Sequence, residues 1–212
     1  MSDLLKVRVG GSDYLCKWEK SSIYKMDFNR FDINTLKDGD VQWNFYNNNR
    51  DGVTLSKAND GLIIDIAAGS TRQFNLPLNQ FNLDKEFITE YEIDITNCTW
   101  TMYYGFGRAS LTYSVREFQG LGLWLYHASN LQIYEGSMTY SSSDWSRITG
   151  MSYSFPLKVK TIYDPNTQYV KVYFFDSLIM EGNIDGNGNI TFNNGGSGNG
   201  TCKLYSLKIY YS

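Results

Sequence analysis

The C-terminal quarter of the chain constrains the fold most, because it consists of short runs in which apolar and polar residues alternate. Phe155–Thr161 alternates and leads to the turn cluster DPNT at 164–167. Tyr169–Phe175 alternates again, a short turn precedes the apolar residues 178–180, and Lys203–Tyr210 closes the sequence. Alternation with period two places successive side chains on opposite faces of a strand, and Pro and Asn favour chain reversal. These runs predict a β-hairpin followed by a closing strand.

The remainder of the chain agrees with an all-β protein. The 212 residues include 17 Tyr, 12 Phe and 19 Gly, and no stretch keeps the i, i+3, i+4, i+7 apolar spacing that an ordinary helix needs. Sandwiches of this length often fold as one unit with a sizeable core. We therefore expect an all-β, antiparallel two-sheet β-sandwich with almost no helix.

Charge and hydropathy exclude two classes of partner. The formal net charge of -3 offers no positive field for a phosphate backbone, so we expect no nucleic acid. No apolar run approaches the roughly 20 residues of a spanning helix, so we expect no membrane insertion. The three cysteines, Cys16, Cys98 and Cys202, are odd in number and far apart, which predicts free thiols.

The chain divides into two unequal parts. Leu4–Val9 alternates, a turn cluster follows at 10–13, and Tyr14–Trp18 alternates back, which predicts a small N-terminal β-hairpin. We expect this hairpin and a connector to occupy residues 1–31 and the sandwich to occupy 32–212. Two interpretations of the hairpin stay open: an extra edge pair on the sandwich, or an arm that attaches the domain to a larger assembly.

Several strand patterns of the main part carry a family resemblance. They are GLIIDI at 61–66, the run 72–78, the hairpin that contains KVY at 171–173, and LYSLKIY at 204–210. Their order resembles the concanavalin A-like (laminin G-like) jelly-roll superfamily of lectins and glucanases, of the kind found in phage and virus tail-fibre or receptor-binding proteins. The resemblance spans roughly residues 32–212 and implies a jelly-roll sandwich. Members of this superfamily mostly bind or cleave carbohydrates.

A row of carboxylates is the only pattern that suggests catalysis. Residues 87–95 alternate, so Glu90, Glu92 and Asp94 share one face of a strand. Residues 92–97 resemble the E-x-D-x-x-E signature of laminarinase-type hydrolases, which implies Glu92 as nucleophile and Asp94 as its assistant. The acid/base position holds Asn97, and an amide cannot donate and recover a proton. We therefore expect no enzymatic activity. The non-catalytic interpretation is a polar sheet face whose carboxylates are solvated or paired with Lys and Arg.

Aromatic residues in the middle of the chain are the candidates for carbohydrate binding. Sugar rings stack their C–H faces on exposed aromatic rings, and nearby polar side chains bond the hydroxyl groups. The Ser-rich stretch 136–151 lacks a clean strand period, which predicts a surface loop. The predicted ligand-binding residues are Tyr140, Asp144, Trp145 and Arg147 of this loop, with Trp100 and Tyr104. Trp43, Trp124 and Phe174 are expected in the core instead.

A Gly/Asn-rich loop offers oxygen ligands at alternate positions. Asp185, Asn187 and Asn189 match the opening of calcium loops, but the bidentate Glu that completes such loops is absent. A weak metal site and an ordinary hairpin turn both stay open. No other cofactor is predicted.

The N-terminus lacks the basic start and apolar core of a secretory signal, which predicts cytoplasmic synthesis without a signal peptide. With the resemblance, this suggests a non-catalytic, carbohydrate-recognising head of a phage or virus tail fibre, spike or other receptor-binding structural protein, located in the virion. The resemblance implies a host-surface glycan, other virion proteins and a homotrimer as partners. The alternatives are a purely structural virion (decoration or baseplate) protein, and a polysaccharide hydrolase or lyase.

Overall fold

The structure is a computed structural model of the 212-residue chain. The N-terminal hairpin and the strands between residues 101 and 147 are described by their backbone. The described stretches are 4–9, 12–17, 22–45, 50–67, 73–98, 101–109, 118–126, 132–137, 145–147, 156–183, 189–194 and 199–212. Within these stretches, every regular element is a β-strand apart from one short 3₁₀ turn, η2 (Leu78–Gln80). None of the described residues belongs to a helix with the length and apolar character needed to cross a membrane.

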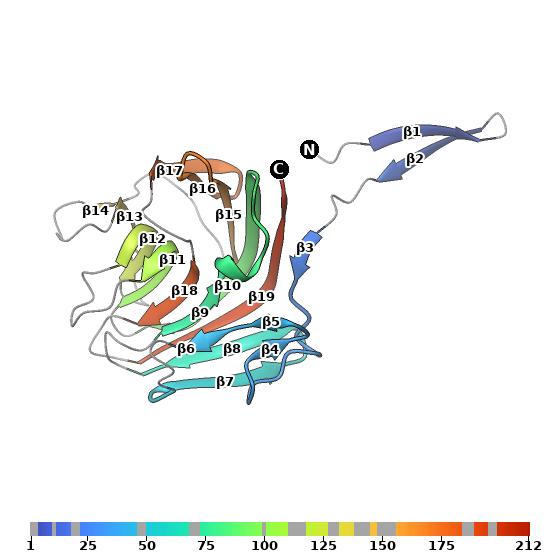
Figure 1. The fold of residues 1–212 in the computed structure, drawn as a ribbon. Helices are drawn as coiled ribbons and strands as arrows, with labels where there is room; N and C mark the ends of the chain where they lie inside the picture. The colour runs from blue at the N-terminus through green and yellow to red at the C-terminus, as the bar shows by residue number, and fades with distance from the viewer. Residues whose placement is uncertain are drawn as a thin grey trace.

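Two large antiparallel sheets lie face to face, as predicted (Figure 1). The larger sheet wraps around one side of the molecule. Its strands are, in order, β17 (Ser177–Asn183), β16 (Tyr169–Phe174), β15 (Leu157–Asp164), β10 (Phe87–Cys98), β19 (Gly200–Tyr211), β8 (Gly61–Ile66) and β7 (Val53–Ala58). An eighth strand, β3 (Ser22–Lys25), pairs with β19 beyond the end of β8.

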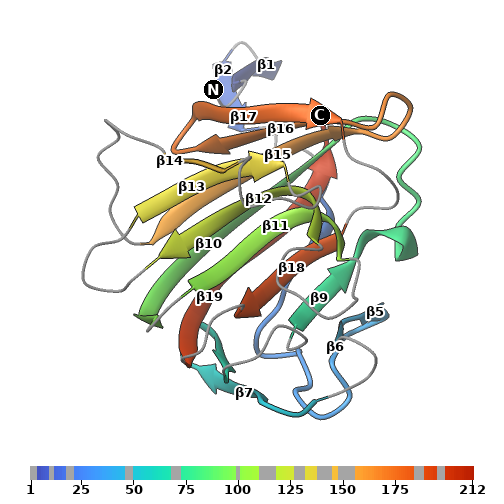
Figure 2. The same cartoon turned by 90° about the vertical axis from the view of Figure 1, so that its left-hand side faces the viewer.

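The second sheet has seven described strands and faces the viewer in Figure 2. Its strands are, in order, β14 (Trp145–Arg147), β13 (Gln132–Ser137), β12 (Phe118–Tyr126), β11 (Thr101–Ala109), β18 (Asn189–Asn194), β9 (Gln73–Pro77) and β6 (Asn44–Phe45). Two short strands, β4 (Lys37–Asp38) and β5 (Val41–Gln42), form a separate pair.

The predicted N-terminal hairpin is present. β1 (Leu4–Val9) and β2 (Ser12–Lys17) pair antiparallel in a sheet of their own, hydrogen-bonded to neither large sheet. Figure 1 shows this hairpin beyond the start of β3. β3 lies inside the predicted connector but pairs with β19, and Met26 and Phe31 are buried in the core. The sandwich therefore draws on residues before 32.

Alternation in the sequence places one side of each strand in the core. In β15, Leu157 and Val159 are buried, whereas Lys158 between them is exposed. In β16, Val170 and Phe174 are buried in the same way. Burial of every second side chain explains why these runs could be assigned to strands without a structure.

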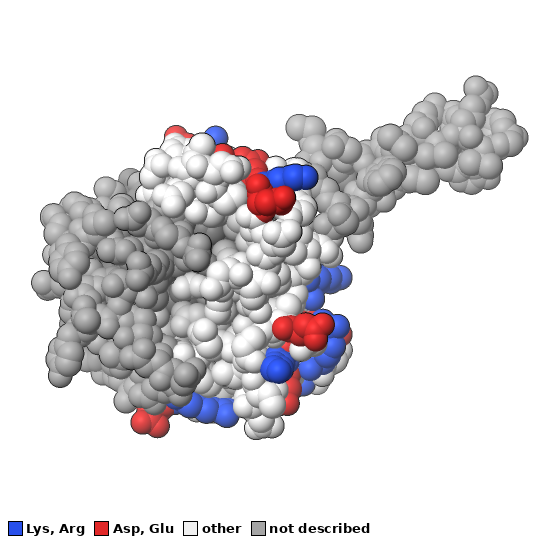
Figure 3. Space-filling model, viewed as in Figure 1, with Lys and Arg blue, Asp and Glu red and all other residues white. Residues whose placement is uncertain are grey.

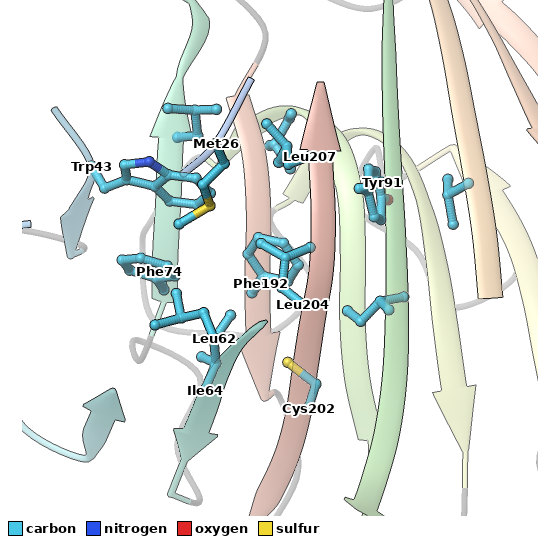
Figure 4. Packing of buried hydrophobic residues seen from close by; sticks show 14 of the residues in the cluster. Met26, Trp43, Leu62, Ile64, Phe74, Tyr91, Phe192, Cys202, Leu204 and Leu207 are labelled. Atoms are coloured by element: carbon cyan, nitrogen blue, oxygen red, sulfur yellow. The ribbon is translucent and has the colours of Figure 1, made fainter. Parts of the chain in front are cut away.

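The core lies between the two large sheets, and its centre is aromatic (Figure 4). Trp43 is fully buried and stacks on Phe74 of β9, with ring centroids 4.7 Å apart and planes inclined by 15°. Phe31 meets both rings edge-on, at 6.1 and 6.4 Å. Phe192 of β18 lies 6.4 Å from Trp43. These rings join the loop region 26–45 to the seven-stranded sheet.

A buried carboxylate supports this region. Asp38 is 1 % exposed and accepts hydrogen bonds from the Tyr24 hydroxyl at 3.0 Å, the Asp27 backbone N–H at 2.9 Å and Arg30 Nε at 2.6 Å. Burial raises the pKa of the Tyr24 phenol, so it stays a hydrogen-bond donor. The Trp43 indole N–H donates in turn to the Tyr24 oxygen at 3.3 Å. Asp38 is thus satisfied by three donors despite its burial.

Truncating Trp43 should be costly. We expect Trp43→Ala to lower the free energy of unfolding by about 4 kcal/mol, because it removes a fully buried ring from three aromatic contacts. Urea denaturation measures this change. Leu178→Ala on β17, where the side chain is 47 % exposed, should cost less than about 1 kcal/mol and serves as the control. Equal losses for the two variants would contradict the described core.

Two turns share the sequence pattern D-x-N-T and the same contacts. Asp32 accepts a bond from the Asn34 N–H at 2.8 Å and from the Thr35 hydroxyl at 2.9 Å. Asp164 accepts the equivalent bonds from Asn166 and Thr167, both at 2.9 Å. Backbone hydrogen bonds hold the pKa of both carboxyl groups below the ordinary value.

These shifts predict how stability depends on pH. A carboxyl group whose pKa is lower in the folded state contributes stability above its unfolded pKa of about 3.9 and loses it as the pH falls through the folded pKa. Urea midpoints should therefore change little between pH 7 and about 5 from these groups and fall below about pH 4. Asp164→Asn should make that acid slope shallower. A midpoint that stays constant down to pH 3 would contradict this prediction.

Candidate functional site

The outer face of the seven-stranded sheet can be traced residue by residue from the strand register. Phe74 of β9 stands opposite Phe192 of β18, and both are fully buried, so this face of the sheet meets the core. The alternate residues, Gln73 of β9 and Asn193 of β18, are also paired and belong to the outer face. Directly opposite residues in antiparallel strands share a face, so the register carries this assignment across the sheet.

One row of the outer face is aromatic. Asn193 pairs with Tyr103 of β11, Tyr103 with Trp124 of β12, and Trp124 with Tyr134 of β13. Tyr134 then pairs with Arg147 of β14 at the sheet edge. Three aromatic residues from successive strands therefore occupy adjacent positions, with an amide at one end and a guanidinium at the other.

The next two rows of the outer face contain glycines at adjacent positions. Gly105 of β11 pairs with Gly122 of β12, and Gly122 pairs with Gly136 of β13. In the following row, Gly107 pairs with Gly120. Glycine carries no side chain, so this strip of the outer face lets a ligand approach the backbone closely. The aromatic row forms one border of the strip.

Unsatisfied acceptors lie on the β9 side of the same face. Gln73 and Asn75 are 4 % and 6 % exposed, and their side-chain oxygens Oε1 and Oδ1 have no hydrogen-bond partner among the described residues. Asn75 pairs with Thr191, which is opposite Gly105, so it belongs to the glycine row. A buried acceptor without a partner costs free energy, and a donor group supplied by a ligand or a water molecule would remove that cost.

The structure places three of the six predicted ligand residues. Trp145 and Arg147 lie in β14, a short strand within the segment that lacked a strand period, and the register assigns both positions to the outer face. Tyr104 stands opposite Phe192, so its position belongs to the core-facing side. Tyr140, Asp144 and Trp100 lie outside the described residues.

Sequence reasoning did not align the central residues of the aromatic row. Trp124 was expected in the core, and Tyr103 and Tyr134 belong to the mid-chain aromatics considered for sugar stacking but not to the six predicted ligand residues. The signal is present in residues 120–126, GLGLWLY, where Leu fills every second position and Gly, Trp and Tyr fill the others. Read with period two, this run separates a core face from an outer face; only the pairing register shows that the outer residues of four strands align.

The carboxylate row lies on the opposite sheet. Tyr91 and Ile93 of β10 are buried, so Glu90, Glu92 and Asp94 share the outer face of the eight-stranded sheet. Glu92 lies 3.6 Å from Lys158 Nζ, Glu90 accepts a bond from the Tyr210 hydroxyl, and Asp94 one from Tyr205 at 3.4 Å. Each of the three carboxylates thus has a cationic or hydroxyl neighbour.

Of the three predicted calcium ligands, the structure describes one, Asn189. Asn189 begins β18 and pairs with Pro77 and Gly107, while Asp185 and Asn187 lie outside the described residues. The described residues contain no group of three His, Cys, Asp or Glu side chains that could hold a metal ion. Of the cysteines, Cys202 is buried in the core and belongs to no disulfide between described residues.

Comparison with solved structures supports the fold. The Emp46p carbohydrate recognition domain, metal-free form, matches with a TM-score of 0.57 and 12 % identity, over 91 % of this chain and 98 % of that one. An alginate lyase, AlgAT5 of polysaccharide lyase family 7, gives 0.52 and 9 %, over 77 % and 84 %. The chain has a concanavalin A-like fold. The predicted jelly-roll sandwich is therefore confirmed.

A sialidase also matches, with a TM-score of 0.53 and 9 % identity, over 80 % of this chain. The match spans only 17 % of the sialidase chain. No family model matches the sequence, and no curated protein matches it either. At these identities the likeness concerns the fold alone.

Proposed function

We propose that this domain is a non-catalytic carbohydrate-binding domain, and that it binds glycan across the outer face of the seven-stranded sheet. The observation that carries the proposal is the register that aligns Tyr103, Trp124 and Tyr134 beside a strip of glycines. Aromatic residues supply flat apolar area for the C–H face of a sugar ring, and a glycine floor leaves room for the ring.

The polar residues of the face suit hydroxyl groups. Asn193 stands opposite Tyr103 at one end of the aromatic row, and an amide is a residue type that can both donate to and accept from sugar hydroxyl groups. Arg147 at the other end of the aromatic row is a residue type that donates to ring or hydroxyl oxygens. In such an arrangement the central aromatic residues fix the plane of a sugar ring, and the polar residues at both ends fix its orientation.

The names of similar structures support the same class of ligand. Emp46p contributes a carbohydrate recognition domain, and AlgAT5 is a lyase for the polysaccharide alginate. Both cover most of their own length when matched to this chain. The likeness itself concerns the fold, so it supports the proposal without identifying the sugar.

Two features favour binding over catalysis. Asn97 occupies the acid/base position of the hydrolase-like motif, and an amide cannot exchange the required proton. The carboxylates Glu92 and Asp94 belong to the eight-stranded sheet, on the other side of the sandwich from the aromatic row, where Lys158 and Tyr205 are their neighbours. A polysaccharide hydrolase or lyase would need another acid and base.

The finer proposal is a receptor-binding head of a phage or virus tail fibre or spike, which acts in the virion on a host-surface glycan. The separate β1–β2 sheet supports it, because a hairpin outside both large sheets suits attachment to other virion proteins. An isolated two-stranded hairpin is marginally stable in water, so a partner chain would stabilise it. A homotrimer belongs to this same proposal.

Trp124→Ala should abolish most of the binding. After a panel of bacterial and archaeal envelope polysaccharides has identified a ligand, we expect calorimetry to show at least a tenfold increase in Kd, because a stacking surface worth about 1.4 kcal/mol or more is lost. Tyr173→Ala is the matched control: Tyr173 is an aromatic residue of β16 that alternates with buried residues and so lies on the outer side of the other sheet. Its Kd should match that of the native protein.

The same samples test the alternatives. Unchanged Kd for Trp124→Ala, or an equal loss for Tyr173→Ala, would contradict the assigned face. Released reducing ends or unsaturated products that disappear in Glu92→Gln would favour the hydrolase or lyase. The absence of binding to every polysaccharide would favour the purely structural virion role.

A further inference from the structure

A hollow lined by charged residues lies on the eight-stranded sheet. β19 pairs with β8 as far as Leu204 and with β3 from Lys208 onward. The Met26 N–H donates to the Leu207 carbonyl at 3.0 Å, so the stretch of this flank that pairs with neither strand is Tyr205 and Ser206. On its other flank, Glu92 of β10 stands opposite Ser206 and Ile93 opposite Leu204, which leaves Tyr205 as an extra residue in a β-bulge. Bulges bend a strand and redirect a side chain, and they are frequent beside functional sites.

The open flank forms a hollow of about 620 Å³. This volume lies in the range of sites that hold small molecules. Charged side chains of both signs gather at the lower right of Figure 3, near the place of β3 and β4 in Figure 1. The charged residues around the hollow are Lys25, Asp27, Arg30, Asp60 and Lys208, and its aromatic residues are Phe28 and Tyr205.

Arg30 is held in a fixed position at this hollow. Its Nε donates to Oδ1 of the buried Asp38 at 2.6 Å. The guanidinium also packs closely against Gly39: a Cβ at that position would lie 3.4 Å from the guanidinium carbon. The Arg30 side chain is nevertheless 56 % exposed. A guanidinium has five N–H donors, so an anchor through Nε leaves others for a ligand. Anchoring lowers the entropy that an arginine loses when it binds an oxyanion.

Lys25 and Lys208 add positive charge at the hollow, and neither lysine is in an ion pair between described residues. They stand directly opposite each other in the β3–β19 register, where like charges are destabilising. Glu90 of β10 stands opposite Lys208 on its other flank.

The acids around the hollow are engaged elsewhere. Asp60 is paired with Lys203, and one oxygen of Asp27 accepts the backbone N–H groups of Asn29 and Arg30, at 3.0 and 3.4 Å. Lys203 in turn lies over the Tyr205 ring, 4.6 Å from its centroid. Two lysines and a fixed arginine therefore face the hollow, together with Asp60, whose charge Lys203 balances, and Asp27, whose hydrogen bonds come from neutral backbone groups.

We propose that this hollow binds the oxyanion group of a small ligand, a carboxylate, sulfate or phosphate, between Lys25, Arg30 and Lys208. The group would offset the repulsion of the two lysines and accept the remaining donors of Arg30. The site lies on the eight-stranded sheet, so it is separate from the aromatic row and does not rest on the proposed glycan-binding face.

Titration of ¹⁵N-labelled protein tests the proposal. Sodium sulfate, sodium phosphate and sodium glucuronate are added separately, with sodium chloride adjusted to keep the ionic strength constant. We expect saturable shifts of the backbone amide signals at 25–30 and 205–208 with at least one of the three. Tighter binding of glucuronate would identify a carboxylated saccharide as the class of ligand; tighter binding of an inorganic ion would identify the free or ester-linked anion.

Lys25→Gln is the decisive variant, because Lys25 is exposed and its loss relieves a repulsion, so the fold should be at least as stable as before. We expect its Kd for the anion to rise at least fivefold, and that of Arg30→Gln to rise as much. Lys171→Gln, on β16 at a distance along the same sheet, is the matched control and should bind like the native protein. Shifts that grow linearly without saturation, an unchanged Kd in Lys25→Gln, or an equal loss in Lys171→Gln would overturn the proposal.

Discussion

Pairing of β19 with β10 is the interaction on which the rest of the sandwich depends. β19 ends the chain but lies in the middle of the eight-stranded sheet, where it also pairs with β8 and β3. It supplies Cys202, Leu204, Leu207 and Ile209 to the core. β19 is twelve residues long, longer than β8 or β3, so it pairs with both of them in succession along one flank. The bulge at Tyr205 and the gap between β3 and β8 follow from this arrangement.

The two sheets offer outer faces of different chemistry. The seven-stranded sheet presents an aromatic row, a glycine strip and two buried amide oxygens without described partners. The eight-stranded sheet presents carboxylates and lysines, among which Glu92 lies 3.6 Å from Lys158. Stacking and neutral hydrogen bonds suit sugar rings, whereas the cationic excess between Lys25 and Lys208 suits an anion. One core thus separates the two proposed sites, which call for ligands of different chemistry.

Local patterns predicted the strands well where one face is buried and the other is solvated. The β15–β16 hairpin, the outer placement of Glu90, Glu92 and Asp94, and the β1–β2 hairpin all follow from alternation and turn residues. The candidate site was predicted less well. Trp145 and Arg147 do reach the outer face, but Trp124 was expected in the core and Tyr104 on the surface, and the register assigns each to the other side. A single strand shows two faces and does not say which one meets the core.

By itself, the sequence determined the all-β class, the strand periods, the turn at Asp164, and an amide instead of an acid at Asn97, because each depends on residues close together in the chain. Only the tertiary structure decided which residues share a row. Tyr103, Trp124, Tyr134 and Arg147 align because four strands adopt one register. Lys25 stands opposite Lys208 because β3 pairs with β19 on the same flank as β8, beyond the point where the β8 pairing ends. Register and strand order arise from burial of the whole core, which no local pattern specifies.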